Sequence, residues 1–397
     1  MSLLGPLNLK RRYCYCAACQ QGFAPSHKAL GLPESDYTAH LEDAATLLAT
    51  TVPHAMAMQL LGRCCGAQLS VKASEQMVDR RATALQAIDH AEAQAMTPYD
   101  PKGLPVAEQP RPSDAVAKQR AAKTVYLELD GVIPMTREQL TGKELSTKDR
   151  RRQQRAKDQK ARGGKARRYR MIGREVKNAV LYDGQDCAKQ SAERGCILHK
   201  TYVSHLGDWL TFAMLLWVAI LRLGFDKARL LVILSDGAEW IRSLAHWLPI
   251  PVLLILDLFH VKHRIWEVAH SLYGEHSAKA CEWAEIQVGR IEDGQAAKVL
   301  QALRFLKPHR RETQELVDKL HGYLKDNRDR MNYPDYRARG LRVSSSAVES
   351  ANYHVTGARL KLQGMRWSPQ GAGQMALLRA DLFNEQWEKR TRTILAA

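Results

Sequence analysis

Val125-Tyr126-Leu127-Glu128-Leu129-Asp130-Gly131 is an apolar, strand-like run that ends in an Asp-Gly pair. Two later runs share this form: Leu230–Gly237 carries Asp236 before its glycine, and Val252–Asp257 ends in Asp257. Short apolar runs bounded by turn residues predict buried strands. A carboxylate at the C-terminal edge of such a strand can help to hold a divalent cation where a substrate reaches it. The three runs therefore predict a sheet with acidic side chains at its edge.

The order of the expected elements indicates an α/β fold. Three strands in succession, then a helix, then alternating strands and helices suit a mixed sheet flanked by helices, as in RNase H-like domains. A doubly wound sheet fits the same periodicity and remains the alternative. The expected strands are 123–133, about 174–183, about 195–204, 229–235 and 252–257, with a helix near 207–222.

The composition is that of a globular, strongly basic protein. The chain has 397 residues, 45% of them apolar, and a net charge of +17. This length suffices for two or three domains, and the charge attracts polyanions, of which nucleic acid is the commonest. The longest apolar run, about 209–221, is shorter than the ~20 residues that cross a bilayer. No signal peptide is evident, so we expect a cytoplasmic protein with reduced cysteines and no membrane partner.

Changes in composition along the chain indicate domain boundaries. Residues 1–96 read as a Cys-rich and then helical DNA-binding module, and five prolines between positions 98 and 112 mark a linker at 97–122. Strand patterns at 123–260 indicate the first part of an RNase H-like catalytic domain. Charged helical periodicity at 261–343 indicates a helical insertion, and 344–397 would complete the catalytic domain.

A basic loop is expected at 143–170, between the first two strands. Residues 148–170 hold twelve Lys or Arg residues against two Asp, with no apolar periodicity. A solvated excursion without a specific role would have this composition, but charge this dense also suits an arm that contacts phosphates. The arginines that we expect to contact DNA from this loop are Arg150, Arg151, Arg152, Arg155, Arg167 and Arg168.

Two-metal phosphodiester chemistry requires carboxylates that fix two cations about 3.5–4 Å apart. We expect Asp130, Asp236 and Glu349 to hold two Mg²⁺ or Mn²⁺ ions, with Glu349 on a helix that begins near Ser344. A single Asp-Gly pair is more often an ordinary turn, so the prediction depends on the whole set.

A carboxylate and an imidazole three residues apart, Asp257 and His260, follow the third run. This pair could orient a metal-bound water, steady a phosphate or donate a proton to a leaving oxygen. A purely structural His260, capping a helix or bonded in the core, fits the same spacing. Asp257 is also the alternative third metal ligand.

Four strings resemble signature blocks of bacterial DDE insertion-sequence transposases of the ISKra type, relatives of the Mutator-like superfamily. They are YLELDGV (126–132), ILSDGAEWI (233–241), LDLFHVKHRIWEVA (256–269) and SSSAVESANYHVTGARLKLQGMRWSPQGAGQMALLRA (344–380). The resemblance runs from about residue 123 to 382, with a weaker match in the opening module.

The resemblance implies an RNase H-like domain with an all-helical insertion before the glutamate. It implies Asp130, Asp236 and Glu349 as the metal-binding triad, with Asp257 and His260 as an accessory pair. In such enzymes a water frees a 3′-hydroxyl at the element end, and that hydroxyl attacks target DNA.

The opening module contains Cys16-x-x-Cys19, the geometry of half a zinc ribbon. Similar transposases carry a further Cys-x-x-Cys upstream that this sequence lacks, so an N-terminally truncated or degenerate ribbon without zinc is the alternative. The conceivable further zinc ligands are Cys14, His27, Cys64 and Cys65.

Two further sets of basic residues are candidates for DNA contact. The pattern at 53–85 is compatible with a helix-turn-helix carrying Arg80 and Arg81, although helical hairpins that only pack are at least as common. Downstream of Glu349 we expect phosphate contacts rather than a merely solvated face from Arg359, Lys361 and Arg366.

These patterns predict a DDE transposase that cleaves double-stranded DNA at the terminal repeats of its own insertion sequence and transfers the ends to target DNA as a homo-oligomer. A non-catalytic DNA-binding protein derived from such an element is one alternative. A metal-dependent nuclease of the same fold, without strand transfer, is the other. The three carboxylates argue against the non-catalytic protein. Only a joined DNA product distinguishes the transposase from the nuclease.

Replacing Arg150, Arg151 and Arg152 by Gln should weaken binding to all DNA sequences alike. Each lost phosphate contact lowers the slope of log K against log salt by about 0.9, so the slope should fall by up to about three. Fluorescence anisotropy at several salt concentrations measures it. An unchanged slope would remove this loop from the DNA interface.

Overall fold

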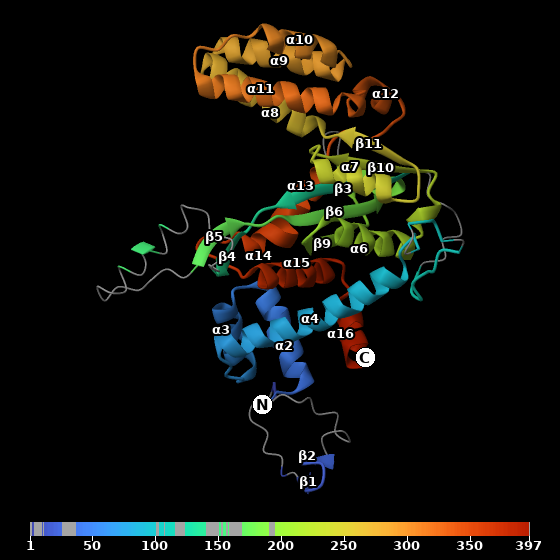
Figure 1. Cartoon of the computed structure of the whole chain (residues 1–397), viewed down its shortest axis with the longest axis vertical. Helices are drawn as coiled ribbons and strands as arrows, with labels where there is room; N and C mark the ends of the chain where they lie inside the picture. The colour runs from blue at the N-terminus through green and yellow to red at the C-terminus, as the bar shows by residue number, and fades with distance from the viewer. Residues whose placement is uncertain are drawn as a thin grey trace. The chain divides into compact units, whose positions relative to one another are not determined.

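The computed structural model of the chain, whose helices and strands are labelled in Figure 1, divides into two compact units. It describes residues 2–3, 10, 12–25, 37–100, 103–106, 108–115, 124–139, 151, 154–155, 158, 169–189 and 195–396. Unit 1 comprises Met1–Asp89, Ile133–Val176 and His354–Ala397, and unit 2 comprises His90–Val132 and Lys177–Tyr353. Both units are therefore built from segments that are distant in sequence.

Unit 2 contains a five-stranded mixed sheet with the order β11-β10-β3-β6-β9. The first strand in the chain, β3, lies at its centre, and β10 runs parallel to both β3 and β11. This sheet, flanked by helices, is compatible with an RNase H-like fold. Its strands are β3 (Thr124–Val132), β6 (Val176–Asp183), β9 (Thr201–Leu206), β10 (Leu230–Ser235) and β11 (Val252–Leu256).

The third expected strand, 195–204, is divided in the structure. Its first part is β8 (Gly195–Ile197), which pairs with β7 (Cys187–Lys189) in a separate two-stranded ribbon. Only β9, which begins at Thr201, joins the main sheet. The sequence prediction therefore merged two strands that belong to different sheets.

One face of β3 packs into the main core. Val125, Leu127 and Leu129 are buried there with apolar residues of α6 (Trp209–Arg222) and α7 (Glu239–Trp247). The side chain of Asp208 begins α6 by accepting a hydrogen bond from the Thr211 amide at 2.8 Å. Because side chains alternate along a strand, the even-numbered residues of β3 face the opposite side of the sheet. That opposite face carries the polar residues of the candidate site.

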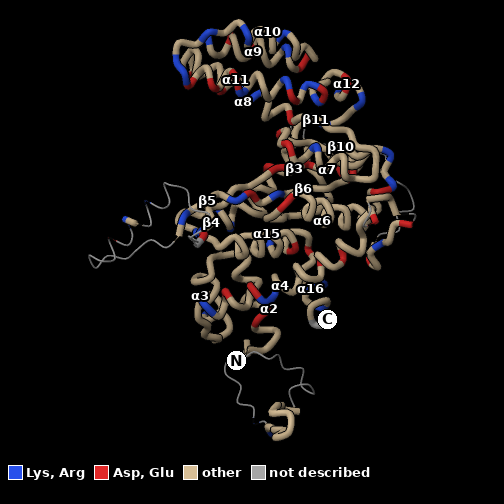
Figure 2. The backbone as a smooth tube through the Cα atoms, viewed as in Figure 1, with Lys and Arg blue, Asp and Glu red and all other residues tan. Residues whose placement is uncertain are grey.

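Helices occupy most of the block that charged periodicity marked as helical. They are α8 (Leu258–Tyr273), α9 (Ala278–Glu292), α10 (Ala296–Phe305), α11 (Arg311–Asp326) and α12 (Tyr333–Ala338). In Figure 1 the helices α8 to α11 pack against one another as a bundle. Both blue and red residues occur along them in Figure 2, and the Glu292 carboxylate forms ion pairs with Lys262 and Arg337, both at 2.8 Å. After these helices the chain continues into α13 (Ser346–Ala351), which carries Glu349.

Unit 1 is mainly helical. It contains the hairpin β1 (Cys14–Cys16) and β2 (Gln21–Phe23), the antiparallel ribbon β4 (Met135–Gln139) and β5 (Tyr169–Gly173), and the helices α2 (Ala39–Thr51), α3 (His54–Cys65), α14 (Ala358–Leu360), α15 (Pro369–Phe383) and α16 (Trp387–Ala396), with α4 (Val71–Ala95) up to Asp89. Helix α15 packs against α2 and β4. Arg390 binds Asp89 through two hydrogen bonds of 2.7 Å, which joins α16 to α4.

The helical hairpin expected at 53–85 is present as α3 and α4. Helix α3 ends at Gly66, whose φ of +71° is a left-handed conformation that glycine adopts without strain. The hydroxyl of Ser70 accepts a hydrogen bond from the Ala73 amide at 3.1 Å, as a residue before a helix does. None of the described helices is both long and apolar enough to span a bilayer.

Candidate active site

Three aspartates follow directly after residues that are paired across neighbouring strands. Ser235 of β10 lies in register with Leu129 of β3 and with Leu256 of β11. The next residue along each strand is Asp130, Asp236 or Asp257. Parallel pairing in this register thus brings all three carboxylates to the same edge of the sheet.

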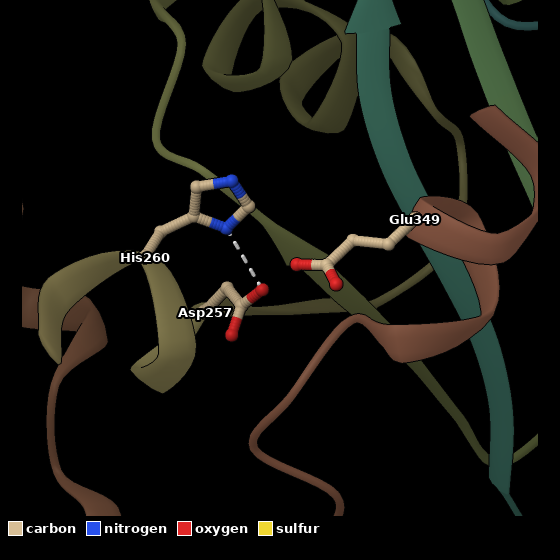
Figure 3. A group of neighbouring side chains, drawn as sticks. All are labelled: Asp257, His260 and Glu349. Atoms are coloured by element: carbon tan, nitrogen blue, oxygen red, sulfur yellow. Dashed lines mark hydrogen bonds and ion pairs between the residues drawn. The ribbon is translucent and has the colours of Figure 1, made fainter. Parts of the chain in front are cut away.

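Glu349 of α13 completes the cluster. Its carboxylate lies with the side chains of Asp257 and His260, and ligand atoms of these three residues are all within 4.8 Å of one another. Figure 3 shows the Glu349 side chain, from α13, directed toward the Asp257–His260 pair at the start of α8. The helices α8 to α12 lie between Asp257 and Glu349 in the sequence.

Asp257 is fully buried, and each of its oxygens is engaged. Oδ1 accepts a hydrogen bond from the Phe259 amide at 2.7 Å, which caps α8. Oδ2 is 3.0 Å from His260 Nδ1 and also accepts a short hydrogen bond from the Ser345 hydroxyl. Burial raises the pKa of Asp257, but these hydrogen bonds outweigh it and hold the pKa below its usual value. The Asp257 carboxylate is thus already compensated by donors of its own chain.

His260 is oriented by Asp257. The hydrogen bond to Asp257 is the main cause of a raised His260 pKa, and the nearby charges of Asp130 and Asp236 act in the same direction. The imidazole is only part-buried. A cationic or proton-donating imidazole is therefore favoured beside the acidic cluster.

In contrast to Asp257, the carboxyl groups of Asp130 and Glu349 have raised pKa values. Burial raises the pKa of Asp130 to about 6, and the charges of Asp236 and Glu349 add to that rise. Burial and the charge of Asp257 raise the pKa of Glu349. Among the described residues, no Lys or Arg forms an ion pair with Asp130, Asp236 or Glu349. Carboxylates that repel one another without a Lys or Arg partner make a favourable place for a cation.

An amide network that local sequence patterns did not reveal orients Asp130. Asn352 Nδ2 donates to Asp130 Oδ2, and Asn178 Nδ2 donates to Asn352 Oδ1 at 2.6 Å. Ser204 in turn donates to Asn178 Oδ1 at 2.7 Å. Asn352 lies three residues after Glu349, about one helical turn, and this spacing was the available signal.

A second network joins the strand of Asp130 to the helix of Glu349. Glu128 is buried in β3, where one of its oxygens accepts from the Tyr182 hydroxyl at 2.6 Å and the other accepts from the Val348 amide at 2.9 Å. Arg342 Nε lies 4.0 Å from Glu128. Burial is the main cause of the raised pKa of Glu128. A carboxylate within an apolar strand is the sequence signal for this residue, although the strand pattern alone predicts only that Glu128 belongs to β3.

The basic residues expected to contact DNA are placed differently from one another. Arg81 is nearly buried in an ion pair with Asp43 at 2.8 Å, and Arg359 is buried and donates to the Ala49 carbonyl at 3.1 Å, which leaves neither guanidinium open to a phosphate. Arg80 is half-exposed and pairs with Glu42 at 2.7 Å. Arg151, Arg155, Lys361 and Arg366 are exposed, and Arg150, Arg152, Arg167 and Arg168 lie outside the described residues.

Cys16 and Cys19 lie in and beside the turn of the β1–β2 hairpin. Hydrogen bonds from Cys19 lower the pKa of Cys16. No third metal ligand accompanies this pair within the part of the chain that the structure describes, and His27 lies outside that part. Zinc binding at this hairpin stays a prediction.

Comparison with known proteins gives one partial family match. The model of a family described as "Uncharacterised protein family (UPF0236)" matches residues 217–393, which include Asp236, Asp257, His260 and Glu349. No curated protein sequence matches the chain. Among solved structures, the chain is similar to the Drosophila P element transposase strand transfer complex, with 10% identity, a TM-score of 0.25 and coverage of 92% of this chain and 83% of that chain. That likeness is too slight to assign a function.

Replacing Tyr182 by Phe should destabilise the protein by about 1–3 kcal/mol, because Glu128 would lose a donor in a buried site. Chemical denaturation measures the change, and Tyr273→Phe, at a 37% exposed tyrosine of α8, is the matched control. Equal stability of Tyr182→Phe and wild type would show that the Glu128 network does not hold β3 to α13.

Proposed function

We propose that the chain is a DDE transposase that cleaves and joins DNA with the help of divalent cations. The observation that supports this most strongly is the gathering of Asp130, Asp236 and Glu349 beside His260, with no ion pair to Lys or Arg among the described residues. The chain as a whole carries a charge of +17, so acidic residues that gather at one edge of the sheet without a Lys or Arg partner require a reason. Cation binding supplies it.

Mg²⁺ or Mn²⁺, as two ions, fits the proposed donor set. Asp130, Asp236 and Glu349 offer carboxylate oxygens, the ligands that these hard cations prefer. When bound, such cations supply Lewis-acid stabilisation of the charge on phosphate oxygens. Asp257 is assigned a different role, because its oxygens are already occupied by three donors.

The chain's own residues contribute positioning and proton transfer. Asn352 fixes the orientation of Asp130, and Asp257 fixes that of His260. With its raised pKa, His260 is suited to hold a phosphate oxygen or to give a proton to a leaving 3′ oxygen. No covalent enzyme intermediate is required, because a water and then a DNA hydroxyl serve as the attacking groups.

The proposed partner is double-stranded DNA, both at the element's terminal repeats and at the target. The exposed Arg151, Arg155, Lys361 and Arg366, together with the basic composition of 143–170, support phosphate contact. Strand transfer also requires two ends to be held together, so we propose a homo-oligomer. A nuclease that hydrolyses DNA without joining it would use the same carboxylates and is the second candidate.

Replacing Asp236 by Asn should abolish both cleavage and joining of DNA while leaving the fold and DNA binding near normal. The change removes a charge and a cation ligand at nearly constant volume. Labelled DNA carrying the ends that flank the gene, incubated with Mg²⁺ or Mn²⁺, measures both products. Asp293→Asn, at an exposed aspartate of unit 2, is the matched control.

Joined product from wild type and Asp293→Asn alone would support the transposase. Cleaved but never joined product would favour the nuclease. Binding with no product in either case would favour a non-catalytic protein, and wild-type activity in Asp236→Asn would rule out the proposed triad.

Mn²⁺ titration should separate cation ligands from positioning residues. Asp130→Asn and Glu349→Gln should each weaken Mn²⁺ binding by more than about 100-fold, because each removes a ligand. Asp257→Asn should weaken it by a smaller factor, at most about 10–100-fold, because Asp257 acts through His260. A loss in Asp257→Asn as large as in Asp130→Asn would instead make Asp257 the third ligand. Calorimetry measures these affinities without DNA.

A further inference from the structure

The β4–β5 ribbon of unit 1 has one face that no described element covers. In its antiparallel register Arg137 lies opposite Met171, and Met135 lies opposite Gly173. Residues at these positions, together with Tyr169, share a face because side chains opposite each other in a ribbon point to the same side. Met135, Tyr169 and Met171 are 46%, 45% and 40% exposed. Large apolar side chains are therefore presented together to solvent.

The opposite face of the ribbon is anchored. Thr136 is fully buried and donates a hydrogen bond to the Ile172 carbonyl at 2.9 Å. The Arg137 amide donates to the Trp367 carbonyl at 2.7 Å, which ties β4 to the segment before α15. The ribbon is thus a fixed platform rather than a free hairpin, and its exposed face keeps a defined shape.

The exposed face also carries positive charge. The Arg137 side chain is exposed, and its Cζ lies 4.6 Å from the centre of the Tyr169 ring. This cation–π contact holds the guanidinium over the Tyr169 ring. The surface therefore offers methyl groups, an aromatic ring and a cation side by side.

The sequence that joins the two strands strengthens the charge argument. Residues 140–168 contain twelve Lys or Arg residues and three Asp or Glu. A second protein surface or a lipid tail would cover the apolar side chains but would not match the positive charge. A partner with apolar edges beneath a polyanionic backbone matches both the apolar side chains and the charge. Duplex DNA has this combination, and its major groove, about 12 Å wide, admits a two-stranded ribbon.

We propose that the exposed face of the β4–β5 ribbon docks in the major groove of duplex DNA. Arg137 contacts a phosphate or a base edge, and Tyr169 and Met171 contact the groove floor. This inference rests on the proposed DNA partner but not on the carboxylate site, because the ribbon and the site belong to different parts of the chain.

DNA binding by the full-length chain, without divalent cations, tests the proposal. The double variant Tyr169→Ala/Met171→Ser should bind about tenfold more weakly with an unchanged salt slope, because uncharged contacts release no counterions. Arg137→Ala should weaken binding and also lower the slope by about one. The matched control is Phe305→Ala, which alters a 76% exposed ring on α10 and should bind as wild type does.

Circular dichroism and thermal melting of each variant show that the fold is kept, and methyl green, a major-groove ligand, should compete with wild type. Affinity of the Tyr169/Met171 double variant within twofold of wild type would overturn the proposal. So would a change from oligomer to monomer in that variant with DNA binding intact, since a second copy would then cover the face. If wild type binds no DNA at all, the proposed function fails as well; if wild type binds and cleaves DNA while the ribbon variants match it, only this inference fails.

Discussion

The register of three parallel strands is the constraint on which the candidate site depends. Leu129, Ser235 and Leu256 are aligned across β3, β10 and β11, and the aspartates that follow them meet only in this alignment. A slip of one residue would turn each side chain to the other face of the sheet. The buried face of β3, packed against α6 and α7, prevents such a slip because it would expose apolar residues. The hydrophobic core thus fixes the geometry of the acidic edge.

Bringing like charges together is unfavourable, and among the described residues the structure offsets this with amide and hydroxyl donors and the His260 imidazole instead of Lys or Arg side chains. Asp130 accepts from the Gly131 amide at 2.7 Å and from Asn352, while Asp257 accepts from two side chains and an amide. Neutral donors orient a carboxylate without cancelling its charge, whereas an ion pair with Lys or Arg would occupy the oxygens that a cation needs. The difference between Asp257, whose pKa is lowered, and Asp130, whose pKa is raised, separates a satisfied carboxylate from one that still lacks a counter-charge.

Sequence patterns located the strand ends and helices, but not the contacts that connect them. The apolar run of α6 and the strands that end before the three aspartates follow from local periodicity, which is a property of neighbouring residues. Glu128 and the Val348 amide are 220 residues apart, so no local pattern could pair them. The division of the third strand into β8 and β9 was missed for a related reason: which sheet a short strand joins is decided by tertiary packing.

The number of Lys and Arg residues in the sequence also does not show which of them are buried. Unit 1 holds several arginines in structural roles: Arg379 donates to the Thr50 and His354 carbonyls at 2.8 and 2.5 Å, and burial together with the charge of Arg379 lowers the pKa of Arg359 to about 10. These guanidinium groups bind carbonyls within the unit and are unavailable to a polyanion. Part of the net charge of +17 therefore stabilises the fold, and affinity for DNA has to come from the exposed cations. Arg137 differs from the other exposed cations named here because its guanidinium lies over the Tyr169 ring, and this contact reduces the freedom that the side chain loses on binding.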